Sequence, residues 1–203
     1  HHTFRFSQRA EADGLVVIDD PLSILRCTNK VYLAERLSCN GIAAPRTAII
    51  GRDNRDSAIR TLGYPLILKE PDGAFSQGVM KASNREEFYR KSDIFFGKSD
   101  LIIAQEFVPT AYDWRIGILG NEVIYACRYY MAEKHWQIVN WKGSGGVRVG
   151  KWDCVPLDKV PPVVLKTALR AAKVIGDGLY GVDLKLIGGK CLVIEVNDNP
   201  SLE

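Results

Sequence analysis

Residues 191–203, CLVIEVNDNPSLE, place a carboxylate inside an apolar run and follow it with a polar turn. The apolar part is typical of a short strand, whose side chains alternate between the two faces of a sheet. Glu195 and Asn197 should therefore lie on one face, and Ile194 and Val196 on the other. A charge within an apolar strand costs free energy unless a partner compensates it. The sequence thus predicts a compensating partner for Glu195.

The preceding strand, LYGVDLKL (residues 179–186), supplies a second carboxylate, Asp183. A two-residue Gly-Gly turn between the strands would place Asp183 and Glu195 on opposite faces of the hairpin. A three-residue loop would bring them onto one face, and a β-bulge would restore the same match. We therefore expect an odd loop or a bulge.

Asp183, Glu195 and Asn197 together predict a metal site. Two carboxylates and an amide oxygen on one patch are hard oxygen ligands, which suit magnesium bound jointly with phosphates. Neither carboxylate has a histidine close to it in the sequence, which disfavours zinc. A solvated sheet face remains the alternative for any one of these residues. The three together favour the metal.

The bulk composition excludes several other classes. The chain has 203 residues and a formal net charge of +3, which is low for a general nucleic-acid binder. Its five cysteines are widely spaced and include no CxxC, as expected for a reducing cytosol. No apolar stretch approaches the length of a membrane span, and no signal peptide is visible. We expect a cytoplasmic protein without direct nucleic-acid or membrane binding.

Two lysines are candidates for phosphate contacts. Lys69 ends the apolar run PLILK and precedes EPDGAFSQGV (residues 70–79), a loop whose glycines would let backbone N–H groups approach phosphates. Lys30 lies on a predicted helix. Neither a Walker pattern nor GxGxxG is present, so each lysine could instead be a solvated surface group.

The strand AQEFV (residues 104–108) could read an adenine edge through its backbone while Phe107 packs against the ring. Asp113 could accept hydrogen bonds from ribose hydroxyls. Arg115 and Arg128 could place positive charge near a transferred phosphate and an anionic substrate. Each of these residues could equally be an ordinary strand end or surface charge.

Strands and helices alternate with hairpins, which predicts an α/β or α+β class in two lobes hinged near residues 106–112. We expect a polar helix over residues 3–13, a buried strand at 15–18, helices at 28–41, 54–62, 83–91 and 161–176, strands at 46–50, 65–70, 78–82 and 101–108, and a hairpin at 113–132 around Gly120–Asn121. Thr28 and the Ser83–Glu86 pair are the expected N-terminal caps.

Five segments in this order resemble the ATP-grasp superfamily, and within it the RimK-like carboxylate–amine (glutamate) ligases. They are TNKVYLAERLSCNGIAAPRT, GYPLILKEPDGAFSQGV, LIIAQEFVPTAYDWRIGILGNEVI, GLYGVDLKL and LVIEVNDNPSLE. The resemblance implies an α+β ATP-grasp fold with two lobes clasping ATP between mainly antiparallel sheets. Residues 1–21 would be the remnant of a largely missing N-terminal pre-ATP-grasp domain, 22–108 the small lobe, and 109–203 the C-terminal lobe with the metal site.

The resemblance also implies roles for individual residues. Those expected to bind ATP are Lys30 and Lys69 at the phosphates, Glu106 and Phe107 at the adenine hinge, Asp113 near the ribose and Asn140 beside the phosphates. Asp183, Glu195 and Asn197 would hold one or two Mg²⁺ ions, for which Mn²⁺ could substitute. Independently of the resemblance, their positive charge makes Arg128 and Arg115 the expected catalytic cations.

The implied reaction phosphorylates a carboxylate with ATP, and an amine then attacks the acyl phosphate to give an amide. Glutamate or another amino acid could be joined to an amino acid, a peptide or a protein tail, and a homo-oligomer is compatible with these expectations. Two alternatives remain: a kinase-type phosphotransferase with an alcohol acceptor, and a nucleotide-sensing module without catalysis.

Overall fold

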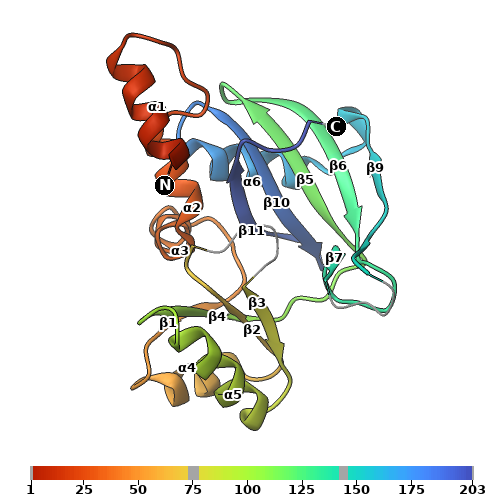
Figure 1. Cartoon of the computed structure of the whole chain (residues 1–203). Helices are drawn as coiled ribbons and strands as arrows, with labels where there is room; N and C mark the ends of the chain where they lie inside the picture. The colour runs from red at the N-terminus through yellow and green to blue at the C-terminus, as the bar shows by residue number, and fades with distance from the viewer. Residues whose placement is uncertain (1, 73–77, 142–145, 203) are drawn as a thin grey trace.

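The computed structural model describes residues 2–72, 78–141 and 146–202. It forms two lobes, each built on an antiparallel sheet (Figure 1). The small lobe contains β1 (Thr47–Ile50), α4 (Arg55–Leu62), β2 (Leu66–Lys69), β3 (Val79–Ala82), α5 (Arg85–Phe96) and β4 (Ile102–Glu106). The large lobe contains β5 (Tyr112–Leu119), β6 (Glu122–Tyr130), β9 (Trp152–Cys154), η1 (Leu157–Lys159), α6 (Pro162–Lys173), β10 (Leu179–Ile187) and β11 (Lys190–Asp198).

Three helices precede the small lobe, and a short two-stranded sheet lies beside the large one. They are α1 (His2–Ala12), α2 (Pro21–Thr28), α3 (Lys30–Cys39), β7 (Val139–Asn140) and β8 (Arg148–Val149). The predicted α+β class with antiparallel sheets is confirmed. No helix among the described residues is long and apolar enough to cross a membrane.

The small-lobe sheet has the order β1-β4-β2-β3, and its two faces differ in character. Leu66 and Leu68 are fully buried in one apolar cluster with residues of α4 and α5. The residues between and after them, Ile67 and Lys69, point to the opposite face because a strand alternates. That second face is directed toward the large lobe and lines its cavities.

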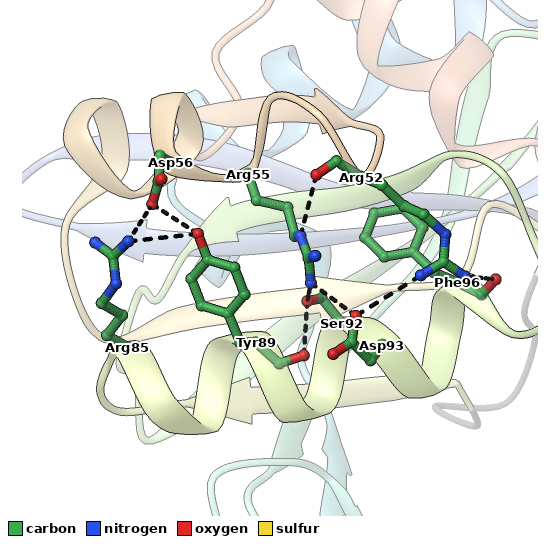
Figure 2. A network of polar contacts seen from close by, with 8 residues as sticks. All are labelled: Arg52, Arg55, Asp56, Arg85, Tyr89, Ser92, Asp93 and Phe96. Carbon is green, nitrogen blue, oxygen red and sulfur yellow. Dashed lines mark hydrogen bonds and ion pairs between the residues drawn. The ribbon is translucent and has the colours of Figure 1, made fainter.

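A polar cluster joins α4 to α5 (Figure 2). The Arg55 guanidinium lies 4.6 Å from the ring centre of Tyr89 and 5.6 Å from that of Phe96. Its Nη1 atom also lies 2.7 Å from an Asp93 carboxylate oxygen. Together these contacts hold α4 and α5 next to each other on the apolar face of the small-lobe sheet. This face is directed away from the large lobe.

The large-lobe sheet has the order β11-β10-β5-β6-β9, and α6 packs on one face of it. Ile116, Val182 and Leu184 are fully buried in that core. The β5–β6 turn places Gly120 and Asn121 at φ values of +56° and +67°, as a tight turn of matching twist requires. This confirms the predicted Gly-Asn hairpin.

The segment predicted to form the small lobe, residues 22–108, includes two helices whose apolar side chains pack with the large lobe. Cys27, Leu33, Leu37 and Ile42 belong to the core of the large lobe. Their side chains are apolar and pack beside β11, so α2 and α3 are anchored on the large lobe, and the small-lobe sheet begins only at β1.

The predicted buried strand at residues 15–18 is wrong. None of the described strands pairs with it, and Val16 is 94% exposed. The buried residue of this region is Asp19, whose carboxylate accepts hydrogen bonds from the backbone N–H groups of Leu179, at 2.6 Å, and Asn199, at 3.0 Å. A carboxylate thus ties the N-terminal segment to β10 and to the residue after β11.

Two predicted helix starts are also wrong. Thr28 is the last residue of α2, a helix that the sequence analysis does not predict. Asn29 caps α3, and its side chain accepts a hydrogen bond from the Tyr32 backbone N–H. The cap of α5 is Asn84, paired with Glu87, one residue later than the predicted Ser83–Glu86 box. Asn and Ser are near-equal capping residues, so adjacent candidates are not separable by type alone.

We expect Asp19→Ala to lower the free energy of unfolding by about 1–3 kcal/mol, because it leaves part-buried backbone donors without their acceptor. Chemical denaturation measures this difference. Asp13→Ala, which removes an exposed carboxylate that pairs with Arg9, is the matched control and should leave the midpoint unchanged. Equal midpoints for the two variants would contradict the anchoring role of Asp19.

Candidate active site

The uncovered faces of the two sheets meet at a cavity of about 130 Å³. Its lining includes seven of the predicted site residues, which come from both lobes and from the segment between them: Lys30, Lys69, Glu106, Phe107, Asp113, Asp183 and Glu195. A neighbouring cavity of about 800 Å³ shares Lys30, Lys69 and Gln105 as lining. Residues up to 165 positions apart in the chain therefore converge on one place.

The register of β10 and β11 places the two carboxylates opposite each other. Asp183 pairs with Glu195, whereas the next residue, Leu184, pairs with Val193. Ile194 is thus the extra residue of a bulge, and the turn is the two-residue Gly188–Gly189. The predicted bulge is confirmed.

The bulge also corrects the expected position of Ile194. We expected Ile194 and Val196 to share the face opposite to Glu195. Val196 is fully buried in the large-lobe core, but Ile194 lines the cavity together with Glu195. An extra residue breaks strict alternation, so two consecutive side chains can serve the same side.

Cations of the protein compensate both carboxylates. Lys30 Nζ lies 2.8 Å from Glu195 Oε1. Arg115 binds Asp183 in a bidentate manner, with Nε–Oδ1 and Nη2–Oδ2 distances of 2.7 Å. The charge of Asp183 raises the pKa of Arg115 above its already high usual value. Planar, paired hydrogen bonds of this kind are among the strongest that side chains form.

The chemistry of Asp183, Glu195 and Asn197 fits a hard cation. Asn197 follows Glu195 on the same face, and its Nδ2 atom donates to Asp183 Oδ2 at 3.1 Å. The set holds two carboxylates and one amide; among the described residues, no three His, Cys, Asp or Glu side chains lie together as a ligand group. Such a sparse oxygen set suits an ion that keeps several ligands from water or phosphate.

Lys69 faces the same cavity from the end of β2. Burial lowers its pKa to about 8, and the charge of Glu195 only partly offsets this effect. The backbone N–H of Glu70, the next residue, donates to the Gly78 carbonyl at 3.0 Å, which closes the base of the glycine-containing loop. Residues 73–77 of that predicted phosphate loop lie outside the described part of the chain.

The cavity wall beside the segment that connects β4 to β5 is aromatic. The Phe107 ring meets Trp136 edge to face, with ring centres 6.0 Å apart, and Lys81 Nζ lies 3.8 Å from the centre of the Phe107 ring. The Glu106 carboxylate accepts from the backbone N–H and Nε of Arg46, at 2.9 and 2.6 Å. The Glu106 side chain thus fixes the end of β4 to the residue before β1, and the Phe107 and Trp136 side chains line the cavity.

A match to a family model described as RimK-like ATP-grasp domain covers residues 27–203. The chain belongs to this family. The chain is 32% identical over 197 residues to a probable alpha-L-glutamate ligase of Vibrio vulnificus, covering 95% of this chain and 62% of that protein. It is also 32% identical over 200 residues to probable alpha-L-glutamate ligase 1 of Shewanella denitrificans, covering 95% of this chain and 64% of that protein.

Solved structures show the same ATP-grasp fold. A RimK domain protein from Sphaerobacter thermophilus matches with a TM-score of 0.73 at 17% identity, over 98% of this chain and 69% of that one. The D-alanine–D-alanine ligase of Bacillus anthracis in complex with ATP matches with a TM-score of 0.76 at 18% identity, over 96% of this chain and 63% of that one. The chain spans less than two thirds of the length of the curated relatives named above.

The structure separates Arg128 from the other site residues of this ATP-grasp chain. Arg128 pairs in register with Trp114, a core residue, whereas Arg115 pairs with Asp183 on the opposite face of the sheet. The Arg128 guanidinium binds Asp153 in a bidentate manner and lies over the Tyr112 and Tyr130 rings. The residue of β6 that lies opposite Arg115 is Cys127, and Arg128 is the next residue along the strand. Neighbouring side chains of a strand point to opposite faces, so Arg128 lies on the other face.

Asn140 lies in β7, where it pairs with Arg148 of β8. Within the described residues, it is not part of the lining of the 130 Å³ cavity. Its expected place beside the phosphates therefore stays a prediction.

Lys185 also lines the cavity, although the sequence analysis does not predict it as a site residue. Its Nζ lies 2.5 Å from Asp113 Oδ1, and Thr110 Oγ1 donates to the same oxygen at 2.9 Å. Burial raises the pKa of Asp113, and the charge of Lys185 opposes this effect. The signal was present, because Lys185 follows Asp183 by two positions on one strand and so shares its face.

Binding of a nucleoside triphosphate near pH 8 should take up about half a proton, because Lys69 is half-protonated there and nearby phosphates raise its pKa. The uptake should vanish below about pH 6.5, where Lys69 is already charged in the free protein. Calorimetry in two buffers of different ionisation enthalpy measures it.

Lys69→Arg is the matched control for this proton uptake. It keeps the positive charge but remains protonated at all working pH values, so binding should occur without uptake. Undiminished uptake in this variant would assign the proton to another group.

Proposed function

We propose that the protein containing this chain is an ATP- and magnesium-dependent ligase that joins a carboxylate to an amine through an acyl phosphate. The observation that carries the proposal is the convergence of Lys30 and Lys69 with Asp183 and Glu195 at one inter-lobe cavity. Membership of the RimK-like ATP-grasp family supports it. Because relatives are named probable alpha-L-glutamate ligases, we propose glutamate or another amino acid as one substrate.

The apolar part of the cavity is the proposed adenine site. Phe107, Trp136 and Ile194 line it and offer flat, water-excluding surface to a base. The backbone of residues 106–108 is the proposed reader of the adenine edge. Asp113, held by Lys185, is the proposed acceptor of ribose hydroxyls.

The cationic part is the proposed phosphate site. Lys69 contributes a charge that is costly in the free protein and becomes favourable beside phosphates, because burial disfavours an ammonium without a counter-charge. Lys30 exchanges its contact with Glu195 for one with phosphate in this proposal. Fixed positive charge of this kind stabilises phosphoryl transfer without any covalent step by the protein.

Asp183, Glu195 and Asn197 are the proposed holders of one or two Mg²⁺ ions, with Mn²⁺ as an alternative that accepts the same oxygen ligands. When bound, such an ion neutralises phosphate charge as a Lewis acid. Lys30 and Arg115 compensate the two carboxylates in the free protein. The two negative charges are therefore tolerated in the folded protein before the ion and the nucleotide bind.

The reaction proposed for the whole protein has two steps. A carboxylate oxygen of the substrate attacks the γ-phosphorus of ATP, and ADP leaves. The amine nitrogen then attacks the acyl carbon, phosphate leaves with the C–O bonding electrons, and the nitrogen loses a proton. Arg115 lies on the face of Asp183 and is the proposed contact for the anionic substrate or the transferred phosphoryl group. Because Arg128 lies on the other face, we assign it no part in these steps.

The test is ADP release by the full-length protein against a panel of acids and amines, with mass spectrometry of the products. An amide together with ADP and phosphate is expected. A stable phosphorylated product would instead indicate a phosphotransferase, and nucleotide binding without turnover a sensor.

Glu195→Gln should lower the rate of ADP release by at least about 100-fold, since loss of a mere outer-shell partner of a metal site already costs 10–100-fold. Glu122→Gln, the same change at an exposed position at the start of β6, is the control and should leave the rate unchanged. The metal assignment fails if Glu195→Gln releases ADP as fast as the wild-type protein.

A further inference from the structure

Two cysteine thiols lie side by side at the edge of the large-lobe sheet. Cys127 of β6 pairs in register with Cys154 of β9, and their Sγ atoms are 3.3 Å apart. They are 27 positions apart in the chain, and both are free thiols. The wide spacing of the five cysteines along the chain does not predict such a pair.

The backbone around the pair has the geometry that a disulfide needs. The Val155 N–H donates to the Ala126 carbonyl at 2.8 Å, so Cys127 and Cys154 form a non-hydrogen-bonded pair between two ladder bonds. The Cα atoms of such a pair are about 4.5 Å apart. Disulfides span Cα distances of about 4.4–6.8 Å, so the bond can close without moving either strand.

We propose that Cys127 and Cys154 are a reversible oxidation site that forms a cross-strand disulfide by exchange with a low-molecular-weight disulfide of the glutathione type. The proposal is independent of the ligase function. It rests on the register, the Sγ–Sγ distance and the difference in exposure of the two residues.

The exposure of the two thiols orders the steps. Cys154 is exposed, so its thiolate attacks one sulfur of the small disulfide and releases one thiolate. Burial, followed by the hydrogen bond with Cys154, raises the pKa of Cys127 to about 12, so Cys127 is a poor first nucleophile. Once Cys154 carries the mixed disulfide, the Cys127 thiolate attacks the Cys154 sulfur and expels the second small thiolate.

The exchange is balanced in atoms and electrons. One S–S bond of the small molecule breaks and one protein S–S bond forms. The two protein thiols lose their protons, and two small thiols are the reduced products. The reverse sequence, driven by excess small thiol, restores Cys127 and Cys154.

The position of the pair gives the bond a structural effect. Cys127 pairs with Arg115 across β5 and β6, so the disulfide lies on the sheet face that carries Asp183. The segment between the two cysteines includes Trp136 and Ile138, which line the cavity. A bond between Cys127 and Cys154 therefore links the two ends of the segment that contains Trp136 and Ile138. It also fixes the three-residue edge strand β9 to β6.

The experiment is intact-mass and peptide-mapping mass spectrometry of the full chain after equilibration in glutathione redox buffers. Oxidising buffer should remove two hydrogens from the protein mass and yield a Cys127–Cys154 linked peptide, and excess reduced glutathione should reverse both changes. Cys39→Ser, which removes the other exposed thiol, is the matched control and should retain the linked peptide. A stable glutathione adduct on Cys154 with Cys127 still reduced would overturn the proposal.

Hydrogen exchange supplies a second readout. The backbone amides of residues 152–155 should exchange more slowly in oxidised wild-type protein than in reduced protein, because the cross-link suppresses opening of the edge strand. Cys154→Ser should abolish this difference between buffers. A buffer-dependent difference of the same size in Cys154→Ser would also overturn the proposal.

Discussion

The structure depends on neutralising two carboxylates that stand opposite each other on one sheet face. Asp183 and Glu195 are paired across β10 and β11, where like charges repel. Arg115, from the neighbouring strand, binds the first, and Lys30, from α3, binds the second. These contacts connect β5, the β10–β11 hairpin and the helix before the small lobe. The same charge arrangement that stabilises the free protein supplies the cations and oxygens that the proposed chemistry uses.

In each lobe, one face of the sheet is covered by an apolar core. Leu66 and Leu68 bury one side of the small-lobe sheet, and Val182 and Leu184 bury one side of the large-lobe sheet. The remaining faces are left for polar and partly buried side chains, which meet at the cavity. The cavity thus lies between two half-covered sheets, which are connected by the short segment after β4.

Much of the site was accessible from the sequence because its residues lie in local patterns. Lys69 ends an apolar strand, Phe107 directly follows another, and Glu195 and Asn197 are two positions apart on a third. The failures share one cause, which is dependence on distant partners. Residues 15–18 look like a strand but pair with none of the described strands, and Val16 is exposed as a result.

By itself, the sequence determined the class of the fold, the hairpins and the requirement that Glu195 be compensated, since alternation and residue chemistry act over a few neighbouring positions. The tertiary structure alone decided that a bulge at Ile194 aligns Asp183 with Glu195, that Lys185 holds Asp113, and that Cys127 meets Cys154. Strand register and long-range pairing set these contacts. They depend on how whole sheets assemble, and no short stretch of sequence encodes them.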